Sequence, residues 1–273
     1  MPQPVATLLR HSLALKSALA GCVETPQPKT VHRLRSTARR MEAVLELLAA
    51  TSADLPNSSP KQKSVRKYLR KIRQAAGKLR DIDVHLEMLD AYKTISDATN
   101  LKRTLNSARK KSARKLQQRL LEDEHEIRRT LENLESTLAP LVDRDLSGGS
   151  IAHAAQSCLA TAVHGLDPRQ DDDLHAIRKA CKTARYIAEI GSEASRTAKK
   201  LAQRFEDIQQ TTGAWHDCLL LLNQAHATLP NDSPLIEKIH ARTLQLRCRA
   251  ESKATSLYPG SSLAHTHARS DVH

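Results

Sequence analysis

Aromatic side chains are scarce in this chain of 273 residues, which has one Trp, one Phe and four Tyr. Glycine is also scarce, with eight residues, whereas Ala, Leu, Lys, Arg, Glu and Gln are common. Aromatic residues favour strands, and the residues abundant here favour helices. Few aromatic rings also leave little for stacking against nucleic-acid bases. We therefore expect an all-α protein that is poorly equipped to bind bases.

Long apolar runs and paired cysteines are missing as well. No run approaches the roughly 20 apolar residues needed to cross a bilayer, so we expect no membrane partner. The five cysteines are Cys22, Cys158, Cys181, Cys218 and Cys248, and no two form a C-x-x-C pair. An odd number at such spacing indicates neither a disulfide framework nor a zinc site. A reducing cytoplasm is therefore the expected compartment.

Positive charge is the property that the chain has in excess. It contains 43 Lys and Arg against 30 Asp and Glu, a formal net charge of +13. Residues 61–120 hold 18 Lys or Arg and 5 Asp or Glu, so this segment alone carries the excess. Such a field attracts an acidic partner. Most charge runs are ordinary solvated helix faces, so composition alone leaves both interpretations open.

Proline, glycine and small polar residues divide the chain into eight segments with helical apolar spacing. The expected helices cover residues 5–21, 30–50, 61–93, 98–138, 150–164, 174–190, 195–227 and 234–256. Four lie on each side of the Ser-Gly-Gly-Ser stretch at residues 147–150. We therefore expect two halves, residues 1–146 and 147–258, followed by a disordered tail over 259–273.

Two of these segments begin with the same pattern of His and basic residues. One reads HRLRSTARR from His32, and the other reads HAIRKACKTAR from His175. The basic followers are Arg35, Arg39 and Arg40 in the first, and Arg178, Lys182 and Arg185 in the second. At 100° per residue, positions +3, +7 and +10 lie within about 80° of the His. Each helix therefore carries one basic stripe, opposite an apolar face.

A second pair of matching segments follows in the same order. Gly77 and Asp81 correspond to Gly213 and Asp217, each pair 136 residues apart, whereas the two stripe histidines are 143 apart. Two signatures repeated in the same order indicate internal duplication. We therefore expect two four-helix bundles related by a pseudo two-fold axis, with their basic stripes facing a shared groove.

The repeated His-x-x-Arg-x-x-x-Arg/Lys stripe, with the segment G-K-L-R-D-I-D-V from Gly77, resembles the CHAD family, the conserved-histidine α-helical domain. The resemblance runs from the first expected helix to Ser256. It implies two four-helix bundles around a basic cavity that binds inorganic polyphosphate, without catalysis and without a cofactor. Many relatives carry a triphosphate-tunnel enzyme domain beside this module, and we expect a stand-alone module here. Targeting to polyphosphate granules is one role that the resemblance suggests.

Polyphosphate is a flexible line of anionic charges, so its binding calls for a long trough of donors. Arginine supplies forked, permanently charged donors that match phosphate oxygens. The leading candidates are the two stripes named above, headed by His32 and His175. The third helix of each half adds Lys67, Arg70, Lys71, Lys78 and Arg80, and Lys199, Lys200 and Arg204. Weaker candidates are Arg109, Lys110 and Arg114, and Tyr186 could donate a hydrogen bond to phosphate.

The two stripe histidines predict a link between binding and protonation. Surrounding positive charge should lower the pKa of His32 and His175 in the empty protein, and a bound polyanion should restore it. We therefore predict that polyphosphate binding takes up protons near neutral pH.

Two other functions remain open at this point. Nucleic acid presents the same phosphates and would compete as a weaker partner. A phosphohydrolase would need a nucleophile or a metal cluster, and the chain has no phosphate-cradling glycine loop and no H-E-x-x-H motif. Asp81, Asp83 and Asp217 could be catalytic acids or metal ligands, but pairing with basic neighbours is the simpler account. We expect a protein that is not an enzyme and holds no metal.

Overall fold

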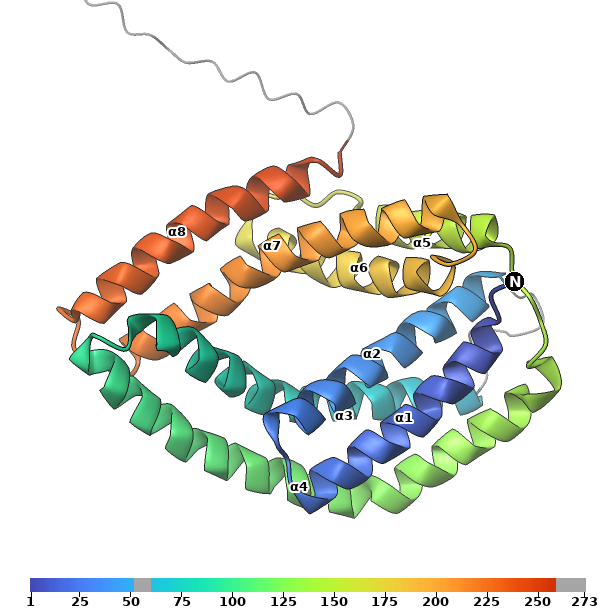
Figure 1. Ribbon diagram of the computed structural model, residues 1–273, viewed down its shortest axis with the longest axis horizontal. Coiled ribbons are helices and arrows are strands. Elements are labelled where there is room, and N and C mark those ends of the chain that lie inside the picture. The colour runs from blue at the N-terminus through green and yellow to red at the C-terminus, as the bar shows by residue number, and fades with distance from the viewer. Residues whose placement is uncertain (52–59, 259–273) are drawn as a thin grey trace, which may run out of the picture.

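The computed structural model describes residues 1–51 and 60–258, without the side chains of Pro60 and Lys61. Within these ranges the regular structure is entirely helical (Figure 1). The helices are α1 (Pro4–Glu24), α2 (Pro28–Thr51), α3 (Pro60–Met88), α4 (Ser96–Leu138), α5 (Gly148–Val163), α6 (Asp171–Ile190), α7 (Arg196–His226) and α8 (Pro234–Thr255), with 3-10 turns η1 (Leu89–Tyr92) and η2 (Ala139–Leu141). The eight expected helices are confirmed. The tail over 259–273 lies outside the described residues.

Local sequence signals account for most helix boundaries. Pro4 and Pro234 lie in the first turn of α1 and α8, where the missing N–H removes no intrahelical hydrogen bond. Ser147, Ser195 and Ser233 cap α5, α7 and α8, each accepting a hydrogen bond from a backbone N–H of the first turn. The largest difference from expectation is at α3, which was predicted to reach residue 93 and ends at Met88.

Helices α1 to α4 pack around one hydrophobic core. Contacts run from α1 to α2, from α2 to α3, from α3 to α4, and from α4 back to α1. Fully buried side chains of this core include Leu8 and Leu15 of α1, Leu34 and Met41 of α2, and Leu69 of α3. These residues recur at helical spacing on one face of each helix, which is the pattern that packs a bundle. The 43 residues of α4 make it about 65 Å long.

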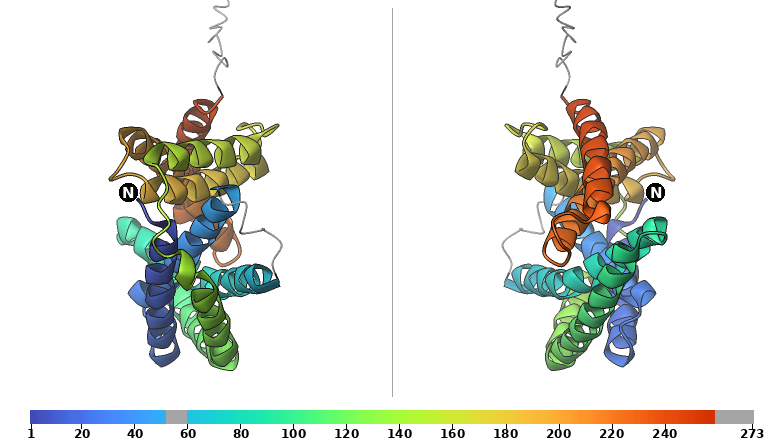
Figure 2. Two further views of the ribbon diagram at one scale, coloured as in Figure 1. Left: turned by 90° about the vertical axis from the view of Figure 1, so that its right-hand side faces the viewer. Right: turned by 90° about the vertical axis from the view of Figure 1, so that its left-hand side faces the viewer.

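Helices α5 to α8 pack around a second core that contains Phe205 and Trp215 of α7. This core also takes in side chains from the first half, among them Ala43 and Leu47 of α2 and Leu101 of α4. Figure 2 shows α5 and α6 above α1 and α4 when the molecule is viewed from either end. The boundary predicted at residues 146 and 147 therefore separates helices that share part of one core.

Two helix pairs join the halves around the functional residues. Helix α2 packs against α6, and α3 contacts α7. The two helices that carry the basic stripes thus lie side by side near the middle of the molecule (Figure 1). Of the helices in residues 1–51 and 60–258, none combines the length and the apolar character needed to cross a membrane.

Candidate functional site

A cavity of about 260 Å³, which we call the central pocket, lies where α2 and α3 meet α6 and α7. The first half contributes His32, Arg35, Ser36, Arg39, Arg80, Asp81 and Val84. The second half contributes Arg178, Lys182, Tyr186, Gln209, Gln210, Gly213, Ala214 and Asp217. Most of the two predicted stripes therefore faces one cavity, as the sequence indicated. Five Arg or Lys side chains line it, against two carboxylates.

The first stripe arginine is held by a glycine and an aspartate on the next helix. Arg35 Nη1 lies 3.5 Å from Asp81 Oδ1. A Cβ added at Gly77 would lie 2.9 Å from the same nitrogen, closer than real Cβ contacts allow. The absence of a side chain at Gly77 thus leaves space for the guanidinium group of Arg35. Asp81, one helical turn further along α3, forms an ion pair with this group and partly balances its charge.

The second half repeats this arrangement. Arg178 Nη2 lies 3.4 Å from Asp217 Oδ1. A Cβ at Gly213 would lie 3.5 Å from Arg178 Nε, which is an ordinary contact. The Gly-x-x-x-Asp spacing that the sequence repeats therefore has the same structural role twice, although the fit is tighter around Gly77. The sequence suggested that these aspartates pair with basic residues next to them in the chain. In the structure they pair instead with arginines of a neighbouring helix.

The positive charges in the pocket are crowded and only partly offset. Burial, followed by the charges of Arg39, Arg178 and Arg35, lowers the pKa of Lys182 to about 7. Burial and the charge of Arg35 lower the pKa of Arg39 to about 10. The buried Nε of Arg39 has no hydrogen-bond partner in the described part of the chain. The empty pocket therefore keeps cations together at a cost that an anion would offset.

The two stripe histidines differ in position. His32 lines the pocket, and burial, followed by the charges of Arg80 and Lys182, lowers its pKa. His175 lies beside the pocket against His216, with ring centroids 4.2 Å apart. Burial and neighbouring Lys179 and Arg178 lower its pKa as well. The predicted direction of both shifts is confirmed, although burial is a larger cause than charge.

Comparison with known proteins adds the family. A model of the CHAD domain matches residues 6–226, most of the chain. The chain belongs to the CHAD family. Curated proteins yield no match. The family match ends with α7, so α8 lies beyond it, although the resemblance seen in the sequence reached Ser256.

Two solved structures share the CHAD fold of this chain. The crystal structure of the CHAD domain from the plant Ricinus communis superimposes with a TM-score of 0.67 at 17% identity, covering 93% of this chain and 91% of the other. PptA from Streptomyces chartreusis superimposes with a TM-score of 0.62 at 18% identity, covering 94% and 99%. At these identities the comparison shows the fold.

Arg40 and Arg185, at the edges of the two stripes, lie outside the central pocket of this CHAD domain. Both are paired with Glu189, at 2.7 Å in each case. Their guanidinium groups also lie over the ring of Tyr186, at 4.7 and 5.5 Å from its centroid. Arg40 therefore joins α2 to α6 beside the pocket, whereas Arg185 joins α6 to α7 through a second ion pair with Glu206 at 3.1 Å. Within this cluster Tyr186 is the only member that lines the pocket.

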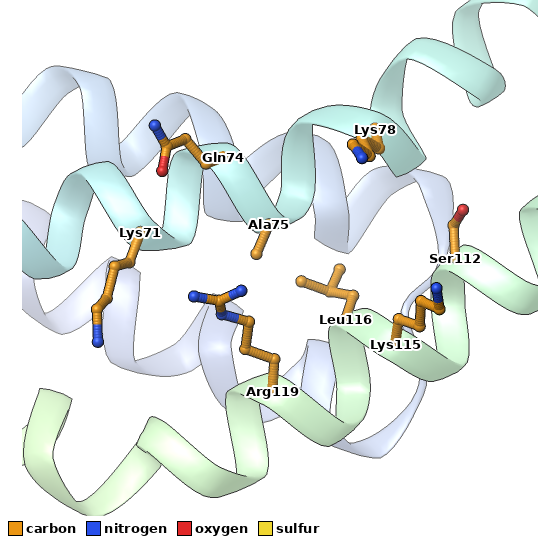
Figure 3. A pocket seen from close by; sticks show the side chains of 8 residues that line it. All are labelled: Lys71, Gln74, Ala75, Lys78, Ser112, Lys115, Leu116 and Arg119. Carbon is orange, nitrogen blue, oxygen red and sulfur yellow. The ribbon is translucent and has the colours of Figure 1, made fainter.

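The candidates on α3 face three different cavities. Arg80 lines the central pocket. Lys67 and Arg70 line a neighbouring cavity of about 500 Å³ that also contains Glu42 and Glu46. Lys71 and Lys78 line a third cavity, between α3 and α4 (Figure 3). The α3 candidates, which were predicted to add to one shared groove, thus lie on different faces of the helix.

The remaining candidates lie away from the pocket. Arg109 is bound to Asp83 at 2.6 Å and to the Pro26 carbonyl oxygen, and Asp83 is almost completely buried. This pair holds α4 against α3. Arg204 donates to the carbonyl oxygen of Ser256. The other exposed candidates that line none of the cavities described here are Lys110, Arg114, Lys199 and Lys200.

Several pocket residues were not among the sequence candidates. Gln209, Gln210 and Ser36 add neutral hydrogen-bonding groups to its wall. Nothing in the sequence pattern marks them as binding residues. Gln209, for example, lies four residues before Gly213 and carries no charge. Among residues 1–51 and 60–258, no three His, Cys, Asp or Glu side chains gather closely enough to hold a metal ion.

Proposed function

We propose that this CHAD domain binds inorganic polyphosphate in the central pocket, without converting it chemically. The main support is the convergence of Arg35, Arg39, Arg178 and Lys182 from two helices on one cavity. Forked guanidinium donors on facing walls can bind successive phosphates of one chain. The low pKa of Lys182 and the unpartnered Arg39 Nε indicate charge that is not neutralised within the protein.

We further propose that the halves are four-helix bundles produced by internal duplication and related by a pseudo two-fold axis. The same arrangement of an arginine against a glycine and an aspartate of the next helix occurs once in each half, which supports this proposal. We also propose a cytoplasmic location, in association with polyphosphate granules. Fluorescence co-localisation with stained granules, lost on Arg35→Glu with Arg178→Glu, would test that location.

A binding titration against long-chain polyphosphate at several salt concentrations tests the main proposal. Arg35→Glu with Arg178→Glu should weaken binding at least a hundredfold, since two charge-assisted contacts at roughly 1.5–3 kcal/mol each are replaced by repulsion. Unchanged affinity in this variant would place the binding site elsewhere.

Two further measurements separate the alternatives. Long-chain polyphosphate should displace single-stranded or duplex nucleic acid at low concentration, whereas failure to do so would favour nucleic acid as the ligand. Incubation with magnesium or manganese should release no phosphate from polyphosphate. Phosphate release that is abolished by Asp81→Ala would instead indicate a hydrolase.

A further inference from the structure

A second group of cations lies in a groove of about 290 Å³ between α3 and α4 (Figure 3). We call it the α3–α4 groove. Its lining residues are Lys71, Gln74, Ala75 and Lys78 of α3, and Ser112, Lys115, Leu116 and Arg119 of α4. Four of the eight are cations and none is a carboxylate. Gln74 and Ser112 add neutral hydrogen-bonding groups, and Ala75 and Leu116 form an apolar floor.

The cations of this groove are largely free of partners. Lys78, Lys115 and Arg119 have no ion pair or hydrogen bond to another side chain in the described part of the chain. Lys71 lies 3.8 Å from Asp123, at the limit of an ion pair. By contrast, Arg73 on the other side of α3 is paired with Glu42 at 2.9 Å. Like charges on facing helices repel one another, and an anion between them would relieve that repulsion.

The groove is separate from the central pocket. Lys71 in the groove and Arg80 in the pocket are nine residues apart, which places them about 180° apart around α3. No residue lines both cavities. A polyanion in one therefore leaves the cations of the other available.

We propose that the α3–α4 groove is a second binding site for a segment of the polyphosphate chain, which rests on the proposed function. Lys71 and Lys78 are seven residues apart, so the cations extend over about 10 Å along α3. Such a row suits a linear polyanion better than a single phosphate. One protein molecule then holds two segments, of the same chain or of two chains, and gains affinity for long chains through the higher effective concentration.

Charge reversal in the groove tests this inference. Lys78→Glu with Arg119→Glu changes two exposed side chains, so folding should be retained, and circular dichroism checks this. Binding of long-chain polyphosphate should weaken about tenfold and become less dependent on salt, because fewer counterions are exchanged. Binding of tripolyphosphate in the central pocket should change much less.

A matched control is Lys238→Glu with Arg249→Glu on α8, which makes the same charge change at two exposed positions outside all the cavities described. Equal loss of long-chain affinity in the groove variant and this control would overturn the inference. A side-by-side titration of the groove variant and of Arg35→Glu with Arg178→Glu distinguishes the two proposals. If the pocket variant alone binds normally while the groove variant does not, the groove stands and the central-pocket proposal fails.

Discussion

The central pocket and the α3–α4 groove are both basic, but their cations are held in different ways. In the pocket, Arg35 and Arg178 are mostly buried and each is paired with an aspartate of the next helix. In the groove, Lys78 and Arg119 are exposed. Buried, positioned cations lose little freedom on binding, and the lowered pKa of Lys182 makes the pocket sensitive to pH, whereas solvated cations respond mainly to salt. The two regions should therefore be separable by pH and by ionic strength.

The largest difference should come from pH, through Lys182. Its pKa is about 7 in the empty protein, and a bound polyanion raises that pKa. Above pH 7 the complex therefore holds more protons than the empty protein, so affinity falls as pH rises, by up to about tenfold per pH unit. Calorimetric titrations at pH 6.5, 7.5 and 8.5, in buffers of different ionisation enthalpy, should show this fall together with proton uptake.

Lys182→Met should weaken binding at pH 6.5 and remove most of the pH dependence above pH 7. Lys78→Met in the groove should keep the pH dependence of the unmodified protein. An equally steep fall with pH in the Lys182→Met protein would mean that another group takes up the proton.

A smaller effect is expected when the two pocket carboxylates lose their charge. Asp81→Asn with Asp217→Asn keeps an oxygen that can accept from Arg35 and Arg178 but removes two negative charges from the wall. The empty protein should lose roughly 1 kcal/mol of unfolding free energy, because both pairs are partly exposed. Affinity for polyphosphate should rise about fivefold, as less repulsion opposes the anion.

Thermal unfolding and titration of the same preparations check both parts of this prediction. Asp123→Asn beside the groove is the control, because its contact with Lys71 is long and weak. It should change affinity less than twofold. Weaker binding in the double Asn variant would show that positioning by the carboxylates outweighs their charge.

The smallest effects are expected from replacing the matching glycines of the two halves, Gly77 and Gly213, by alanine. Ala in place of a helical glycine stabilises a protein by about 1 kcal/mol when space allows. Gly213→Ala should do so with affinity unchanged, because its Cβ meets Arg178 at an ordinary distance. Gly77→Ala should displace Arg35 and weaken binding about threefold. Unfolding curves and polyphosphate titrations of the two single variants test this prediction. Equal affinities of Gly77→Ala and Gly213→Ala for polyphosphate would contradict the tighter fit around Gly77.

The sequence predicted the helices well because their ends depend on local signals. Pro28, Ser147 and Pro234 mark the starts of α2, α5 and α8, and their effect on the backbone does not depend on the packing of other helices. The end of α3 was less predictable, since Leu89 leaves the α-helix and is buried in the core shared with α5 to α8. That core includes residues of α5 to α8, which no local pattern around Leu89 contains.

The site was predictable to the extent that a helical wheel describes it. Arg35 and Arg39, within about 60° of His32, line the pocket, whereas Arg40 and Arg185 lie about 80° from their histidines and reach Glu189 instead. The pairing of Arg35 with Asp81 connects two helices, so spacing could suggest the residues but not the contact. The different positions of His32 and His175 also depend on the neighbouring helix, where His216 lies against His175.

The core shared between the halves bears on how the protein unfolds. Ala43 and Leu47 of α2 and Leu101 of α4 are buried among side chains of α5 to α8. Pulling the halves apart would expose these residues and open the second core. Loss of the first half should therefore destabilise the second, and the two halves are expected to melt together in one cooperative transition. In this respect the two halves should behave as a single folding unit.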